Sequence, residues 1–125
     1  MTTANNLQSY RKLFVYQKAK ILVLEIYKLT KNFPSNENFI LVPQMRRAVI
    51  SVLANLVEGY SKGSSKEFVR FLTISIGSAT ELEVFLDLSL DLGYIDSKTL
   101  DKINILLLEV KKLLYGTRKS AKLRG

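Results

Sequence analysis

The stretch that decides the fold is residues 64–93, SSKEFVRFLTISIGSATELEVFLDLSLDLG. Ser64 and Glu67 match the S-x-x-E capping box, in which two side chains satisfy free backbone amides at the start of a helix. Apolar and small residues then recur at spacings of four and three, which is the period of one helix face. These residues are Phe68, Leu72, Ser75, Ala79, Leu82, Leu86 and Ser89. Gly93 favours termination, so the pattern predicts a helix from about Ser65 to Leu92.

The centre of this predicted helix is unusually small, with Ser75, Gly77, Ser78, Ala79 and Thr80 close together. A glycine in a helix interior costs about 1 kcal/mol relative to alanine. We therefore expect another helix to approach closely at this point.

Three further apolar faces with the same period predict three further helices. The first ends before Pro34, because the residue before proline disfavours the α conformation. The second begins near Pro43 and ends near Gly63, and Asp96 or Ser97 caps the last. Their core faces are Val15, Ala19, Leu22, Ile26, Leu29 and Phe33; Met45, Val49, Val52, Leu56 and Tyr60; and Leu100, Ile103, Leu107, Val110 and Leu114.

The connections between these helices are short, which favours antiparallel neighbours. The expected fold class is all-α, an antiparallel up-down four-helix bundle. We expect a flexible N-terminus over residues 1–12, the bundle over residues 13–115, and a basic C-terminal tail over residues 116–125. Gly116 is the expected start of fraying.

The amino-acid composition excludes several kinds of catalytic and metal-binding site. The chain of 125 residues contains no histidine and no cysteine, which removes the commonest general base and the thiolate metal ligands. No apolar run approaches the roughly 20 residues of a membrane span, and the N-terminus does not resemble a signal peptide. We expect a soluble, cytoplasmic protein that is not an enzyme and needs no cofactor.

Net charge is +8, and six of the excess positive charges lie in the last fifteen residues, which contain no acid. By contrast, residues 64–96 carry a net charge of −4. Such asymmetry favours polyanion partners. The candidate nucleic-acid-binding residues are Lys111, Lys112, Arg118, Lys119, Lys122 and Arg124. The alternative is that this basic end is merely solvated.

Cross-helix ion pairs are expected from the helical rise of about 1.5 Å per residue. About the turn at Gly63, Arg47 (or Arg46) lies at the height of Glu81, and Glu58 at the height of Arg70. Glu81 is expected to be half-buried, where a charge is rarely left unpaired. We interpret these residues as structural ion pairs that fix the register between helices or between subunits, rather than as a functional site. Asn55 is interpreted as a satisfied buried amide.

Two weak motifs are rejected. Residues 59–66 resemble a phosphate loop, but the glycine spacing is wrong and no Gly-Lys-Ser/Thr follows. Glu83, Asp87 and Asp91 share one helix face, yet without histidine the di-metal bundle pattern is missing. No metal site is predicted.

The predicted second and fourth helices are apolar beyond one face. The additional residues are Ile50, Leu53, Ala54, Val57, Ile105, Leu106, Leu108 and Leu113. A helix packed against two neighbours within one chain would explain this width. A second face buried between subunits would explain it too, and we favour an oligomer.

The middle of the chain resembles a known family. The residues that carry the resemblance are Gln44-Met45-Arg46-Arg47-Ala48, Ser51, Asn55-Leu56-Val57-Glu58-Gly59, Phe71-Leu72, Gly77-Ser78 and Glu81-Leu82-Glu83. This pattern resembles the four-helix bundle protein family, also called the 23S rRNA intervening-sequence protein family. The resemblance extends from Leu13 to Leu114. It departs at Tyr16, where tryptophan is usual, and at Leu56 and Val57, where isoleucine is common.

The resemblance implies a bacterial four-helix bundle that assembles into a homopentamer with a central channel, and it brings no catalytic residues. A related branch serves as the accessory protein of retroelement reverse transcriptases, where a basic pentamer binds the enzyme and nucleic acid. Two functions are therefore expected. One is an oligomeric protein that binds RNA or DNA electrostatically, and the other is a protein-interaction adaptor.

Overall fold

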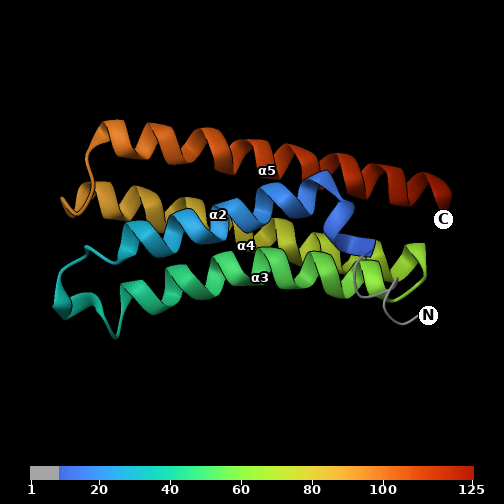
Figure 1. Ribbon diagram of the computed structural model, residues 1–125, viewed down its shortest axis with the longest axis horizontal. Coiled ribbons are helices and arrows are strands. Elements are labelled where there is room, and N and C mark those ends of the chain that lie inside the picture. The colour runs from blue at the N-terminus through green and yellow to red at the C-terminus, as the bar shows by residue number, and fades with distance from the viewer. Residues whose placement is uncertain (1–8) are drawn as a thin grey trace.

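The computed structural model describes residues 9–125, and within this range the chain forms helices and no strands. Four α-helices run alternately up and down (Figure 1). They are α2 (Phe14–Thr30), α3 (Leu41–Ser61), α4 (Ser65–Asp91) and α5 (Ser97–Arg124), with short 3₁₀ helices η1 (Tyr10–Lys12) and η2 (Ser35–Glu37). The predicted all-α four-helix bundle is confirmed.

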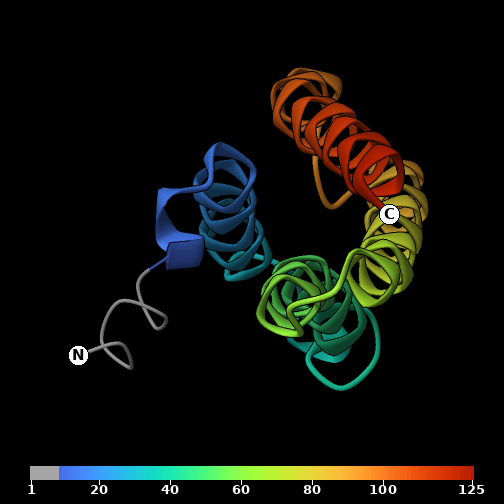
Figure 2. The same ribbon diagram turned by 90° about the vertical axis from the view of Figure 1, so that its right-hand side faces the viewer.

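Each long helix packs chiefly against two neighbours. The packed pairs are α2 with α3, α3 with α4, α4 with α5, and α5 with α2. Viewed end-on, α2 and α4 lie at opposite corners of the bundle (Figure 2). Their outer faces therefore point away from one another.

The core matches the predicted faces closely. All seven predicted core residues of α4 are buried, and so are the five predicted on α5. Leu29 and Tyr60 are only half-buried, whereas Thr30 is buried at the end of α2. The Thr30 hydroxyl donates to the carbonyl of Ile26 at 2.8 Å. A buried polar side chain is satisfied in this way by its own helix.

Small side chains bring α3 and α4 together. Ser75 donates from Oγ to the carbonyl oxygen of Val52 at 2.6 Å, and the hydroxyls of Ser51 and Ser78 lie 2.7 Å apart. Asn55 donates from Nδ2 to both the carbonyl and the hydroxyl of Ser51, each at 2.9 Å, as expected for a satisfied amide. Close helix contact at the small centre of α4 is confirmed, but it does not involve Gly77. That glycine is exposed, and apart from the adjoining backbone of α4 no atom of residues 9–125 lies within 4 Å of the position of a Cβ.

Helix boundaries follow the capping chemistry. The hydroxyl of Ser64 accepts from the amide of Glu67 at 3.2 Å, so the predicted cap of α4 is confirmed. The carboxylate of Asp96 accepts from the amide of Thr99 at 2.8 Å and begins α5. Gly63 and Gly93 have φ of 81° and 79°, the left-handed conformation that glycine tolerates at such turns.

The end of the chain differs from expectation. Helix α5 does not fray at Gly116 but continues to Arg124 (Figure 1). Ala121 is fully buried near its end, so packing holds the last turns in place. Of the segment expected to be a flexible N-terminus, residues 1–8 lie outside the described part of the chain, and Tyr10–Lys12 form η1. No helix from residue 9 onward is both long and apolar enough to cross a membrane.

Candidate nucleic-acid interface

The basic end of α5 is docked against the beginning of α4. Arg118 donates from Nη1 to the hydroxyl of Thr73 at 3.2 Å, and Ala121 is buried beside it along the helix. A Cβ placed on Gly125 would meet the Cβ of Ser65 at 3.4 Å, an ordinary van der Waals distance. Because the end of α5 is helical and packed, its basic side chains project from fixed positions.

This docking adds one basic residue that the sequence did not indicate. Lys66, on the first turn of α4, lines the same shallow pocket as Lys122 and Ala121. Arg124 lines a second shallow pocket over the α3–α4 turn, beside Gly63 and Ser64. We call this group the cationic end; it comprises Lys66, Arg118, Lys119, Lys122 and Arg124. Lys66 and the α5 residues are more than fifty positions apart in sequence, so only the tertiary fold could join them.

The six residues predicted to bind nucleic acid are not equivalent. Lys111 donates to Glu83 at 2.7 Å, and its side chain is only 16% exposed, so its charge is already neutralised within the chain. Arg118 is half-buried and lies over the ring of Tyr115 at 5.2 Å. The four exposed members, which form no ion pair within residues 9–125, are Lys112, Lys119, Lys122 and Arg124.

An aromatic side chain accompanies these cations. Tyr115 is 46% exposed and lies between Lys112 and Lys119 on the outer face of α5. An exposed ring flanked by cations is a surface on which a nucleobase can stack while its phosphates are neutralised. Tyr115 was not among the residues predicted to bind nucleic acid. The signal that could have found it is its spacing, three residues after Lys112 and four residues before Lys119.

The predicted cross-helix ion pairs are wrong within the described chain. Glu58 pairs with Lys62 at 3.0 Å, and Arg70 pairs with Glu67 at 3.2 Å, each within its own helix region. Arg47 and Glu81 are both exposed and form no ion pair in residues 9–125. Matching two positions by helical rise does not place their side chains on the facing sides of the helices, and both of these side chains are exposed.

Arg46 has a different role from that expected. Its Nε donates to the hydroxyl of Thr30 at 3.0 Å and its Nη2 to the carbonyl of Tyr27 at 3.3 Å. Its guanidinium also lies 4.4 Å from the centroid of the Tyr27 ring. A cation placed on the last carbonyls of α2 complements the negative end of the helix dipole. Arg46 therefore fastens α3 to the end of α2.

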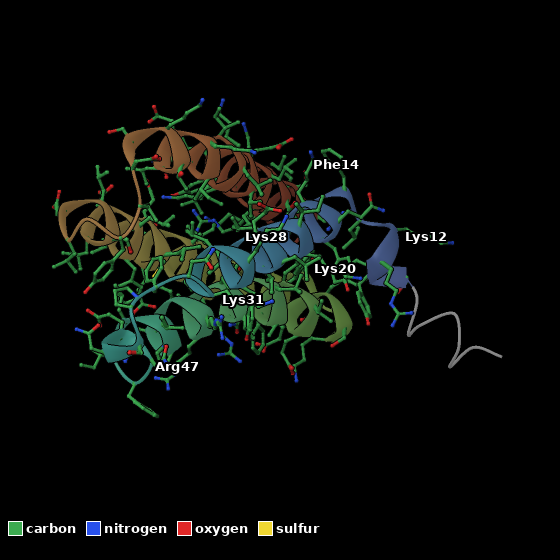
Figure 3. The ribbon with its side chains drawn as sticks, turned by 60° about the vertical axis from the view of Figure 1, so that its left-hand side comes forward. Lys12, Phe14, Lys20, Lys28, Lys31 and Arg47 are labelled. Atoms are coloured by element: carbon green, nitrogen blue, oxygen red, sulfur yellow. The ribbon has the colours of Figure 1, made fainter. Side chains whose placement is uncertain are left out.

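A second basic surface lies on the opposite side of the molecule from α4. Residues 9–47 contain eight basic and two acidic residues, a net charge of +6. Figure 3 shows Lys12, Lys20, Lys28 and Lys31 following one another along η1 and α2, with Arg47 of α3 beyond them. This surface does not stand out in the sequence as the C-terminal run does, because its lysines are separated by apolar residues.

The described residues offer few side-chain groups arranged for metal binding or acid–base chemistry. From residue 9 onward, no three carboxylates gather closely enough to hold a metal ion. A groove of about 710 Å³ runs between α2 and α5. Side chains of both charges line it, among them Glu25, Asp96, Lys28 and Lys102. At its edge Tyr94 donates to Glu37 at 2.6 Å, and this hydrogen bond raises the pKa of the phenol. The strongest chemical feature remains fixed positive charge.

Comparison with known proteins agrees with this architecture. The family model described as "23S rRNA-intervening sequence protein" matches residues 11–116. A crystal structure of a protein of unknown function from the S23 ribosomal protein family of Bacteroides thetaiotaomicron superposes with a TM-score of 0.75. The two chains are 29% identical over 84% of this chain and 98% of the other. No curated protein matches significantly. The chain therefore belongs to the 23S rRNA-intervening sequence protein family.

Proposed function

We propose that this protein is a non-enzymatic, oligomeric scaffold of the cytoplasm that binds RNA or DNA electrostatically. The observation that carries the proposal is the cationic end, where basic side chains from α4 and α5 converge. Four of its five members, Lys66, Lys119, Lys122 and Arg124, are exposed and have no ion pair within residues 9–125. Lys112 and Tyr115 extend this surface along α5.

Phosphate neutralisation is the physical use of such a surface. Each lysine or arginine that contacts a phosphate releases condensed counterions. The logarithm of the binding constant therefore falls linearly with the logarithm of the salt concentration. Tyr115 adds a stacking surface that favours unpaired bases. Base edges are not read by these groups, so we propose binding with little sequence preference.

Assembly would multiply weak contacts. The family resemblance implies five copies, and each copy would contribute one cationic end to the particle. Linked sites bind with an effective concentration set by their geometry, which raises avidity without any new contact. We therefore include a homo-oligomer, with five subunits as the expected number, in the proposed function.

A matched pair of charge reversals tests the binding site. Lys119→Glu/Lys122→Glu changes the cationic end, whereas Lys98→Glu/Lys102→Glu changes exposed lysines at the other end of the same helix. Both variants carry the same net charge. In fluorescence anisotropy with labelled single-stranded RNA, we expect the first to weaken binding at least about tenfold and to reduce the salt slope by about two.

The control should retain most of the affinity. Equal losses in the two variants would mean that binding follows net charge alone and not the cationic end. No binding by the natural sequence even at low salt would reject the proposed function altogether.

A second candidate function is a protein-interaction adaptor, such as an accessory subunit of a reverse transcriptase. Phe39 and Ile40, in the α2–α3 connection, favour it because they are 92% and 67% exposed. Adjacent exposed apolar side chains of this size mark interaction sites. Co-purification with a reverse transcriptase encoded beside it, lost in Phe39→Ser, would support this function; retention in that variant would reject this contact.

A further inference from the structure

The outer face of α4 carries acidic residues that have no ion-pair partner in the described part of the chain. Glu81, Asp87 and Asp91 are exposed and form no ion pair anywhere in residues 9–125. Between them, Val84 and Leu88 are 53% and 44% exposed. The spacing of Glu81, Val84, Leu88 and Asp91 is three, four and three, so these four lie on one stripe. This acidic stripe has apolar side chains at its centre and carboxylates at its ends.

The outer face of α2 has the complementary composition. Lys20, Lys28 and Lys31 are exposed and likewise form no ion pair within the described residues. Leu24, between them, is 59% exposed, and Tyr27 is 37% exposed. Figure 3 shows Lys20 and Lys28 along α2 and Lys31 just past its end. This basic stripe also has an apolar centre flanked by charge.

The two stripes match in length. At about 1.5 Å per residue, the acidic stripe from Glu81 to Asp91 is about 15 Å long and the basic stripe from Lys20 to Lys31 about 16 Å. Both present side chains at three- and four-residue spacings, which is the pattern of packed helix pairs. Apolar contact at the centre with opposite charges at the ends suits one stripe to the other.

We propose that the basic stripe of α2 in one copy of this chain docks on the acidic stripe of α4 in the next copy. This inference rests on the oligomer in the proposed function and names the surfaces that would build it. Because α2 and α4 occupy opposite corners of the bundle (Figure 2), one copy can engage two neighbours at once. Such a heterologous contact generates a ring when the rotation closes.

Gly77 gains an explanation from this arrangement. It lies on the same side of α4 as Glu81 and Val84, and apart from the adjoining backbone of α4 no atom of residues 9–125 lies within 4 Å of a Cβ placed there. A helix of a neighbouring copy could approach the backbone closely at this point. That close approach would offset the intrinsic cost of glycine within a helix.

The exposed apolar side chains of α5 are a weaker choice for the same contact. Ile105 and Leu108 are 72% and 50% exposed. However, α5 packs directly beside α4, so the outer faces of these two helices are adjacent rather than opposed. The charges nearest the end of α5 belong to the cationic end, which we assign to nucleic acid.

Charge exchange tests the docking. The α2 reversal is Lys20→Glu/Lys28→Glu/Lys31→Glu, and the α4 reversal is Glu81→Lys/Asp87→Lys/Asp91→Lys. The combined sixfold variant exchanges the two stripes and leaves the net charge unchanged. Sedimentation velocity at micromolar concentration should show a discrete oligomer for the natural sequence, monomers for each reversal, and a restored oligomer for the sixfold variant. Lys98→Glu/Lys102→Glu should assemble normally.

Three results would overturn the inference. The first is a natural chain that stays monomeric to about 100 µM, and the second is a reversal that assembles normally. The third is a sixfold variant that stays monomeric although circular dichroism shows native helix content and cooperative melting. The same melts establish that each reversal is folded, which is expected because all six side chains are exposed.

Anisotropy measurements on the same proteins separate this inference from the proposed function. The sixfold variant retains the cationic end and the net charge, so it should bind RNA as the natural chain does. A monomeric natural chain that still binds RNA would remove the docking while leaving electrostatic binding intact. A charge-dependent oligomer that binds no RNA would support the docking and reject the nucleic-acid function.

Discussion

Gly59 shows how one residue fixes the distance between two helices. A Cβ at this buried position would lie 2.7 Å from the Cβ of Phe71 and 3.1 Å from Cδ1 of Phe68. The Phe71 Cβ cannot move without its backbone, so Gly59→Ala should lower the free energy of unfolding by about 1–3 kcal/mol. Urea denaturation measures this change. Gly116→Ala is the control. A Cβ there would meet no atom of residues 9–125 within 4 Å apart from the adjoining backbone of α5, so the substitution should instead raise stability by up to about 1 kcal/mol.

The adjacent residues Arg46 and Arg47 should differ in how much each stabilises the fold. Arg46 makes two hydrogen bonds and a ring contact with α2, whereas Arg47 is exposed without an ion pair in the described chain. Arg46→Ala should cost about 1–2 kcal/mol of unfolding free energy, since charge-assisted hydrogen bonds and a cation–π contact are lost. Arg47→Ala should change it by less than about 0.5 kcal/mol. Equal effects in urea denaturation would contradict the role of Arg46.

At the scale of the element, α5 begins with a titrating cap. The backbone amide of Thr99 donates to Asp96 and lowers the pKa of that carboxyl from its ordinary value of 3.8. A lowered pKa means that the stabilisation is present above the ordinary value and is lost as pH falls through the folded one. Asp96→Asn keeps a capping oxygen without the titration. Thermal melts should therefore show the natural chain losing stability relative to this variant below about pH 4.

The C-terminal end of α5 should be a stably folded helix and not a frayed one. Ala121 is fully buried against the bundle, so amides near it should be protected in hydrogen-exchange mass spectrometry. Ala121→Asp would place an unpaired carboxylate in that contact, and the last turns should undock and exchange rapidly. Fast exchange after Gly116 in the natural chain would instead mean that this end frays in solution. Ser120→Asp, at an exposed position beside it, is the control and should leave protection unchanged.

At the scale of the whole molecule, one hydrogen bond links the two connections at the same end of the bundle. Tyr94, after α4, donates to Glu37 of η2 and packs against Phe33. The carboxylate partner raises the pKa of the phenol from its ordinary value of 10.0. A raised pKa gives stabilisation that is present below the ordinary value and is lost as pH rises through the folded one.

Tyr94→Phe isolates this link. It should lower the melting temperature by a constant amount between pH 7 and 9 and by less above about pH 10, where the natural chain loses the hydrogen bond. The other five tyrosines are common to both proteins and cancel in the comparison. A difference that does not change with pH would mean that ionisation of Tyr94 is not linked to folding.

The tertiary arrangement of the helices also explains why the candidate site could be predicted only in part. The basic residues of α5 were evident in the sequence, but Lys111 proved to be paired, and Lys66 joined the site from the start of α4, far away in sequence. The predicted ion pair between Arg47 and Glu81 does not form within residues 9–125 because the rise per residue matches only the heights of two positions. It does not place their side chains on the facing sides of the two helices, and both side chains are exposed.

The sequence by itself determined the elements and the core. Apolar spacing placed the buried faces, while Ser64, Asp96 and the two turn glycines ended or began helices, because these effects depend on neighbours within a few residues. Only the tertiary structure decided that α5 continues past Gly116, that Arg46 fastens two helices, and that α2 and α4 lie at opposite corners of the bundle. Those outcomes depend on which surfaces meet across the bundle, and contacts between residues far apart in sequence leave no periodic signal along the chain.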